Sequence, residues 1–153
     1  YWFVDQAEFS RKQREGDFLE SAQVFDNFYA TSRSAVEELL QGGEDVILEI
    51  DWQGARQVRK LMPEHISIFI LPPSREALES RLQNRGQDNV AIIARRMQDA
   101  KQEISHYSEY DYLVINDNFS VALAELSCVI QAQRQKTPRL GQLKQEIIHS
   151  LLA

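Results

Sequence analysis

Short apolar runs rich in β-branched residues constrain the fold of this chain more than any other feature of its sequence. They are Val46–Ile50, Ile66–Leu71 and Tyr112–Asn116. Near-continuous hydrophobicity over such a length is typical of parallel strands that are buried on both faces of a sheet. We therefore expect three strands of this kind.

Helical patterns lie between and after these runs. The sequence predicts helices over Gln53–Leu61, Arg75–Asn84, Val90–Tyr107 and Val121–Gln135. Pro72-Pro73-Ser74 supplies a break and a cap before the second of them. A last amphipathic helix is expected near the C-terminus, from Leu140, Leu143, Ile147 and Leu151. Alternating strands and helices indicate an α/β fold with a mainly parallel sheet.

Residues 1–45 have a different character. Phe18–Phe25 alternates loosely in hydrophobicity, and Asp26-Asn27 offers a turn before Phe28-Tyr29, which predicts a hairpin. One helix is expected over Glu8–Arg14 and another from Ser32 to about Leu40. This part of the chain is predicted to be a small β-rich lobe.

Composition limits the classes of function. The 153 residues fit one domain, and the net charge of −6 excludes an overall basic nucleic-acid binder. No apolar run approaches the roughly 20 residues of a membrane helix. Cys128 is the single cysteine, so we expect a reducing, cytoplasmic setting.

The stretch Glu49–Gly54 is the strongest local signal of a site. Two carboxylates, Glu49 and Asp51, lie two residues apart, where a parallel strand would lead into a ligand crevice. A nucleotide or metal site is one interpretation. The alternative is that Asp51 only caps the helix that follows.

An arginine set follows the second apolar run, on either side of residues 86–89. Its members are Arg81, Arg85, Arg95 and Arg96. Guanidinium groups on both sides of a polar turn can close over a polyphosphate and neutralise its charge, which would make this segment a lid. The alternative is a solvated helical face whose arginines pair with acidic neighbours, namely Glu79, Asp88 and Asp99.

Polar side chains also occur among the apolar residues of the β-rich lobe. They are Tyr1, Glu20, Tyr29 and Thr31. Tyrosyl hydroxyls can donate to a phosphate, and a carboxylate can accept from two ring nitrogens of guanine. Exposed strand residues would show the same pattern, so these residues alone do not separate the two interpretations.

Taken together, these stretches resemble guanylate kinase nearly end to end. The matching pieces are Tyr1–Val4, Gly16–Glu20, Asn27–Ser32, Glu49–Gly54, Ile70–Ser74, Arg85-Gly86 with Arg95–Met97, and Val114–Asp117. The resemblance implies a P-loop-kinase-like parallel sheet flanked by helices. It also implies a GMP-binding lobe over about residues 1–45, and a core over 46–153 with a helical lid at about 84–97.

The resemblance implies an enzyme of purine metabolism that transfers the γ-phosphoryl group of ATP to GMP. Tyr1 and Tyr29 would hold the GMP phosphate, and Glu20 and Thr31 the guanine. Asp51 would stand between GMP and the transferred phosphate. By the same resemblance, dGMP is an alternative acceptor.

On the ATP side, the resemblance makes Arg85 and Arg96 the lid arginines that clamp the phosphates. They would be catalytic together with Asp51. Asn116 would lie near the adenosine, and Mg²⁺ would come with ATP rather than be held at a metal site of the chain itself. Neither a nucleic acid nor a membrane partner is expected.

The chain also departs from the family pattern. No Gly-Lys pair of a phosphate-binding loop occurs, nor does the Thr-Thr-Arg stretch that precedes Tyr1 in the family. We therefore expect a chain cut from a longer enzyme and inactive by itself. Further departures from the usual residues are Ala30, Glu49, Asn84 and Asn118. The alternative function is a non-catalytic guanylate-kinase-like module that binds proteins.

Overall fold

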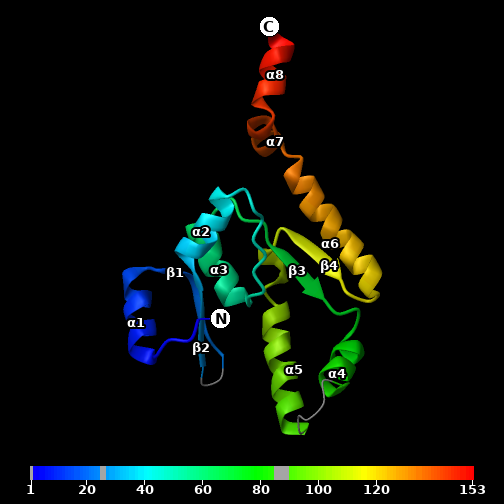
Figure 1. The fold of residues 1–153 in the computed structure, drawn as a ribbon. Helices are drawn as coiled ribbons and strands as arrows, with labels where there is room; N and C mark the ends of the chain where they lie inside the picture. The colour runs from blue at the N-terminus through cyan, green and yellow to red at the C-terminus, as the bar shows by residue number, and fades with distance from the viewer. Residues whose placement is uncertain (1, 25–26, 85–89) are drawn as a thin grey trace. The chain divides into compact units, whose positions relative to one another are not determined.

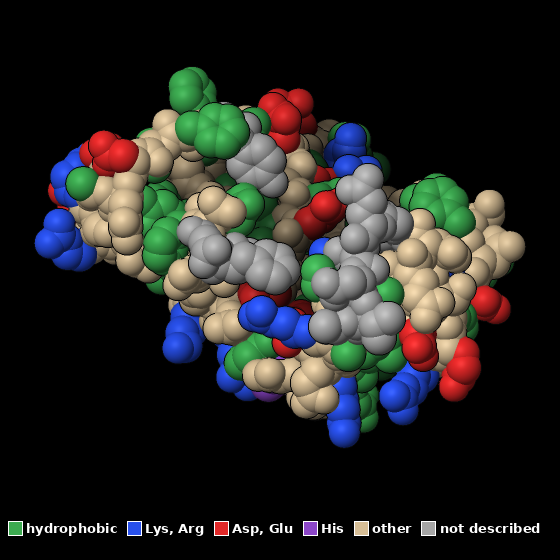
Figure 2. Space-filling view, turned by 90° about the horizontal axis from the view of Figure 1, so that it is seen from below, with side chains coloured by type: hydrophobic (Ala, Val, Ile, Leu, Met, Phe, Trp, Pro, Cys, Tyr) green, Lys and Arg blue, Asp and Glu red, His purple; other side chains and the backbone are tan. Residues whose placement is uncertain are grey.

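The computed structural model describes residues 2–24, 27–84 and 90–153, which are drawn in colour in Figure 1. The chain divides into two compact units, Tyr1–Ser67 and Ile68–Ala153. No helix in the described ranges is long and apolar enough to cross a membrane. Acidic, basic and hydrophobic side chains are mixed on the face seen in Figure 2.

The first unit is built around the predicted hairpin. Its elements are α1 (Gln6–Glu15), β1 (Phe18–Val24), β2 (Asn27–Ser32), α2 (Arg33–Gln41) and α3 (Trp52–Leu61). The two strands are antiparallel, with Glu20 opposite Thr31 and Ala22 opposite Tyr29. The predicted hairpin and all three helices of this unit are confirmed, although part of its turn, residues 25–26, lies outside the described ranges.

Local signals explain where these helices begin and end. Asp5 caps α1 by accepting a 2.8 Å hydrogen bond from the amide of Glu8, and α1 ends at Gly16. Gly16 has a φ of 76°, a left-handed conformation that glycine adopts without a steric penalty. Ser32 caps α2 in the same way, through the amide of Ala35. Phe18 is paired with Ser32, so both helices join the hairpin at its open end.

The core of the first unit joins β1 to both helices that follow. Leu19 of β1 packs with Val36 of α2 and Val58 of α3. Burial of such aliphatic side chains contributes roughly 1.5–3 kcal/mol each. This core fixes α3 against β1.

The expected strand over Val46–Ile50 is not formed. Among the described residues, no strand pairs with this segment. It is extended, and every second side chain packs on the core, namely those of Val46, Leu48 and Ile50, whereas that of Ile47 is 73% exposed. The prediction of burial on both faces was wrong, because the second face has no cover in the described structure.

The second unit contains a parallel strand pair. Its elements are β3 (Ile68–Leu71), α4 (Arg75–Asn84), α5 (Val90–Ile104), a 3-10 turn (Tyr107–Glu109), β4 (Tyr112–Ile115), α6 (Phe119–Arg134), α7 (Thr137–Leu143) and α8 (Gln145–Leu152). Ile68 pairs with Tyr112 and Leu71 with Ile115. Helix α6 packs on β4, as Figure 1 shows. The expected α/β alternation with parallel pairing is confirmed here.

The C-terminal region differs from its prediction. We expected one amphipathic helix, but the structure has two, α7 and α8, which are separated at Lys144. Lys144 has a φ of −116°, outside the helical range. Because the apolar spacing continues through both helices, the pattern alone does not reveal a break at one residue.

Candidate functional site

Among the described residues of the predicted site, Glu20 is the most enclosed charged side chain. It lies on β1 and is 6% exposed. Thr31, its cross-strand neighbour on β2, donates a 2.6 Å hydrogen bond from Oγ1 to Glu20 Oε1. A hydroxyl bonded to a carboxylate at this distance is a strong, charge-assisted contact. The structure therefore brings together two residues that the sequence assigned to guanine.

Tyr29 lies on the same face of the hairpin. It is two residues before Thr31 on β2, and side chains two residues apart in a strand point to the same side. Tyr29 is exposed, so its ring is accessible next to the Glu20–Thr31 pair. Tyr1, the other predicted phosphate-binding tyrosine, lies outside the described residues.

Asp51 stands at the start of α3. Its Oδ1 accepts a 2.8 Å hydrogen bond from the amide of Gly54, so Asp51 is the N-cap of that helix. The structure therefore confirms that Asp51 caps the helix that follows it, as the alternative interpretation of the sequence expected. Capping uses one lone pair of one carboxylate oxygen, so it leaves acceptor capacity for a ligand.

Gly54 connects Asp51 to Glu20. Its amide binds Asp51, while a methyl group added at its α-carbon would lie 3.0 Å from Glu20 Oε2. Both carboxylates therefore lie at the N-terminal turn of α3. The positive end of a helix dipole favours negative charge at this place. Glu49, the other member of the predicted acidic pair, is exposed.

In the second unit, the ends of the parallel strands carry polar residues. The amide of Asn116, which directly follows β4, donates a 2.8 Å hydrogen bond to the carbonyl of Leu71 at the end of β3. Ser74 caps α4, as predicted, through the amide of Ala77. Asn118 caps α6 by accepting from the amides of Ser120 and Val121. Ligands of open α/β sheets bind at the carboxyl ends of strands, and Asn116 occupies such an end.

The predicted lid is described in part. Arg96 is half-buried on α5 and its neighbour Arg95 is exposed. Both residues take part in interactions within the chain. Arg85 lies outside the described residues, so its relation to Arg96 stays a prediction.

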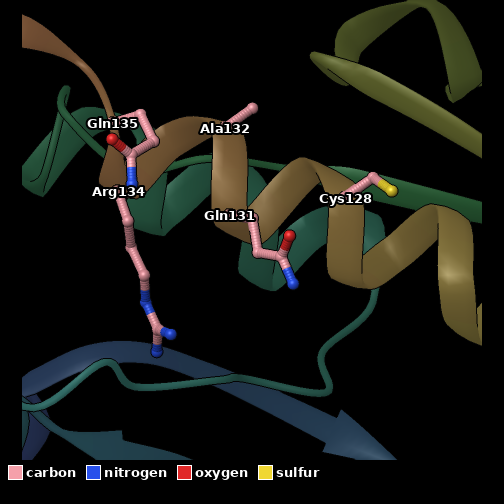
Figure 3. A pocket seen from close by; sticks show the side chains of 5 residues that line it. All are labelled: Cys128, Gln131, Ala132, Arg134 and Gln135. Carbon is pink, nitrogen blue, oxygen red and sulfur yellow. The ribbon is translucent and has the colours of Figure 1, made fainter.

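The described residues of the second unit line at least two hollows. The larger, of about 810 Å³, lies between α4 and α5 and is lined by residues such as Leu78, Met97 and Lys101. The smaller, of about 480 Å³, is lined by four residues of α6 and by Gln135, which directly follows that helix (Figure 3); the four are Cys128, Gln131, Ala132 and Arg134. None of the described predicted site residues lines either hollow.

Comparison with known proteins identifies the family. The family model described as "Guanylate kinase" matches residues 1–133. The chain belongs to the guanylate kinase family. The predicted family and fold class are confirmed by this match and by the solved structure described below.

Relatives of high identity support the same assignment. The chain is 56% identical to the guanylate kinase of Methylococcus capsulatus over 152 residues, which cover 97% of this chain and 74% of the relative. It is 58% identical to that of Chromohalobacter salexigens, covering 100% of this chain and 71% of the relative. The crystal structure of guanylate kinase from Anaplasma phagocytophilum aligns with a TM-score of 0.75 and 37% identity, over 95% of this chain and 73% of that one.

These comparisons confirm the prediction of an enzyme. Guanylate kinases are phosphotransferases, and this chain shares with them both its sequence and its fold. The alternative of a non-catalytic interaction module receives no support from the relatives above.

Proposed function

We propose that the first unit binds GMP, with its guanine on Glu20 and Thr31. The observation that carries this proposal is the buried Glu20 carboxylate, held at 2.6 Å by Thr31. A carboxylate accepts hydrogen bonds from two ring-side donors of guanine, whereas the corresponding edge of adenine lacks that donor pair. A buried acceptor left unpaired by the wrong base costs affinity, and this cost creates selectivity.

The phosphate of GMP would be held by tyrosyl hydroxyls. Tyr29 lies on the same hairpin face as Thr31 and is exposed to a ligand. Tyr1 is proposed to act with it. Asp51, at the start of α3, is proposed to lie between GMP and the transferred phosphoryl group. In this arrangement residues 1–45 form the GMP-binding lobe.

We propose that ATP is bound by the core of residues 46–153. Asn116 would lie near the adenosine, since it stands at the carboxyl end of the parallel strand pair. Arg85 and Arg96 would clamp the phosphates from a lid at about residues 84–97. Guanidinium groups match phosphate oxygens in geometry and neutralise charge that develops during transfer.

Phosphoryl transfer requires positioning and electrostatic stabilisation rather than covalent help from the protein. Mg²⁺ bound with ATP would supply charge neutralisation of the phosphates. Mg²⁺ keeps several of its waters and binds largely through substrate phosphates, so we propose that it arrives with ATP.

We propose a separate role for each group of residues. Glu20 and Thr31 select the base, the tyrosines hold the acceptor phosphate, and Arg85 and Arg96 are catalytic through charge neutralisation. Asp51 is proposed to orient the acceptor. A cytoplasmic place of action fits substrates that belong to nucleotide metabolism.

Phosphoryl transfer by the full-length protein tests this proposal. ADP formation from ATP is measured with GMP, dGMP and AMP as acceptors, for the wild-type protein and for Glu20→Gln. We expect a strong preference for GMP over AMP, and we expect Glu20→Gln to lower it by roughly tenfold or more, because an amide presents a donor to one of the guanine donors.

Calorimetric titration separates the two nucleotide sites. GMP and Mg-ATP are titrated separately into the wild-type protein and into Glu20→Gln. Weakened GMP binding with unchanged Mg-ATP binding in Glu20→Gln would support the base-reading role. A wild-type protein that uses GMP and AMP equally well, or a Glu20→Gln variant with unchanged preference, would contradict the assignment.

A further inference from the structure

Gln57 makes an unusual pair of contacts with the backbone next to Glu20. The amide nitrogen of Ser21 donates to Gln57 Oε1 at 3.1 Å, and Gln57 Nε2 donates to the carbonyl of Ser21 at 2.9 Å. The side-chain amide thus bonds to both backbone groups of one strand residue. Gln57 itself is half-buried on α3.

The geometry of an antiparallel pair explains this contact. Along such a strand, alternate residues direct their backbone groups away from the partner strand. The two contacts show that Ser21 directs its groups away from β2 and toward α3. On this side of β1, Gln57 makes the two backbone hydrogen bonds that a neighbouring strand would otherwise make. It thereby fixes β1 to α3 at Ser21, the residue after Glu20.

Gly54 brings the same helix against the Glu20 side chain. It precedes Gln57 by three residues, a spacing that places both on one helix face. A methyl group on Gly54 would lie 3.0 Å from Glu20 Oε2 and 3.2 Å from the β-carbon of Ile50. Helix α3 therefore contacts the strand through Gln57 and approaches the carboxylate through Gly54.

We infer that Gln57 and Gly54 are positioning residues that set base selectivity by fixing the Glu20 carboxylate toward the guanine of GMP. This inference rests on the proposed role of Glu20. Hydrogen bonds weaken steeply when their angle departs from linear. The strength of the two hydrogen bonds that the Glu20 carboxylate would accept from guanine therefore depends on the position of β1.

The test compares two glutamines that both contact Ser21. Gln57→Leu removes both backbone contacts while keeping similar size and good helix propensity. The matched control is Gln13→Leu, because Gln13 Nε2 contacts only the hydroxyl of Ser21, at 3.1 Å. Steady-state kinetics of the full-length enzymes are measured with GMP and with AMP at saturating ATP.

We expect Gln57→Leu to raise the KM for GMP by roughly tenfold and to lower the preference for GMP over AMP, since two backbone groups lose their partners. The kcat at saturating GMP should change by less than about threefold, because the transferred phosphoryl group is not touched. Gln13→Leu should behave like the wild-type enzyme. A purely structural role would lower activity with both acceptors equally.

Gly54→Ala provides a second variant if Gln57→Leu does not fold, which thermal unfolding would reveal. Alanine favours the helix by roughly 1 kcal/mol over glycine, yet its methyl group presses on Glu20. The same rise in KM and the same loss of base preference are expected. A folded variant with unchanged base preference, or one whose activity falls equally with GMP and AMP, would overturn the inference.

The outcomes also separate this inference from the proposed function. If Glu20→Gln leaves the preference for guanine unchanged, the role of Glu20 itself fails. If Glu20→Gln lowers that preference while folded Gln57→Leu and Gly54→Ala do not, only the role of α3 fails.

Discussion

Thr31 and Glu20 are cross-strand neighbours, and the Thr31 hydroxyl donates to Glu20 Oε1 at 2.6 Å. The contact ties β2 to the most enclosed acidic side chain of the described site. Glu20 is also approached by α3, through Gly54. The Glu20 carboxylate is thus held between β2 and α3. A fixed orientation suits a carboxylate that recognises a base through directional hydrogen bonds.

Thr31→Val should weaken GMP binding while leaving the chemistry intact. Valine keeps the shape and strand propensity of threonine but removes the donor, so we expect the KM for GMP to rise by roughly tenfold. Kinetics with GMP and AMP measure the effect. Thr31→Ser retains the hydroxyl and should restore most of the affinity. An unchanged KM in Thr31→Val would show that the hydrogen bond does not serve the base.

Asp51→Asn should separate capping from catalysis. Asparagine caps helices as well as aspartate does, so the free energy of unfolding should change by less than about 0.5 kcal/mol. Loss of the charge should nevertheless lower kcat by roughly tenfold or more. Asp51→Ala should lose activity and also about 1 kcal/mol of stability. Urea unfolding and steady-state kinetics measure both quantities.

Asp5 offers the matched control for Asp51. It caps α1 with the same geometry, a 2.8 Å bond from an amide three residues later. Asp5→Asn should leave both stability and kcat unchanged, and Asp5→Ala should cost only stability. If Asp51→Asn also keeps full kcat, Asp51 serves only as a cap.

The Glu8–Arg11 pair predicts a local pH dependence in α1. Hydrogen bonds from Arg11, at 2.8 and 3.1 Å, hold the pKa of Glu8 below its ordinary value of 4.5. Because the pKa of Glu8 is lower in the folded than in the unfolded protein, its ionised form stabilises the fold at pH values above the unfolded pKa. This stabilisation is lost as the pH falls through the folded pKa. Glu8→Gln should therefore lower the urea midpoint slightly at pH 7 and have no effect in strong acid.

Removal of the other partner checks this prediction. Arg11→Gln breaks the same two hydrogen bonds to Glu8 and should likewise lower the urea midpoint at pH 7. If the Glu8→Gln and wild-type proteins have the same midpoint at pH 7, the surface pair contributes nothing measurable, as many exposed pairs do.

Local sequence signals predicted much of the fold. The limits of α4 were predicted to the residue, and the apolar runs at Ile66–Leu71 and Tyr112–Asn116 contain β3 and β4. The prediction failed at Val46–Ile50, where hydrophobicity suggested a strand but no strand pairs with it among the described residues. Composition measures strand propensity, whereas a strand also needs a partner for its backbone groups.

The sequence proposed a set of site residues but not their geometry. Glu20, Thr31 and Asp51 were proposed from residue types and from the family resemblance. Their connection through Gly54 was not, because it depends on how α3 packs on β1. Gln57 was missed altogether, although its spacing from Gly54 is a helical repeat. A polar side chain that faces a strand has no distinctive sequence pattern.

Arg96→Ala should lower kcat by roughly a hundredfold with little change in the KM for GMP. The reason is that a lid arginine neutralises charge that develops on the ATP phosphates during transfer, whereas GMP is held by other residues. Arg96 is half-buried on α5. Steady-state kinetics with both substrates varied measure the effect.

Arg95→Ala is the control for Arg96, because it removes the same charge from the neighbouring, exposed position of α5. It should change kcat by less than about twofold, as expected for an exposed charge. Arg96→Lys keeps the charge but not the planar fork of donors, so it should restore only part of the rate. If Arg95→Ala and Arg96→Ala lower kcat equally, both arginines act only through the net positive charge of α5, and Arg96 has no specific contact with the phosphates.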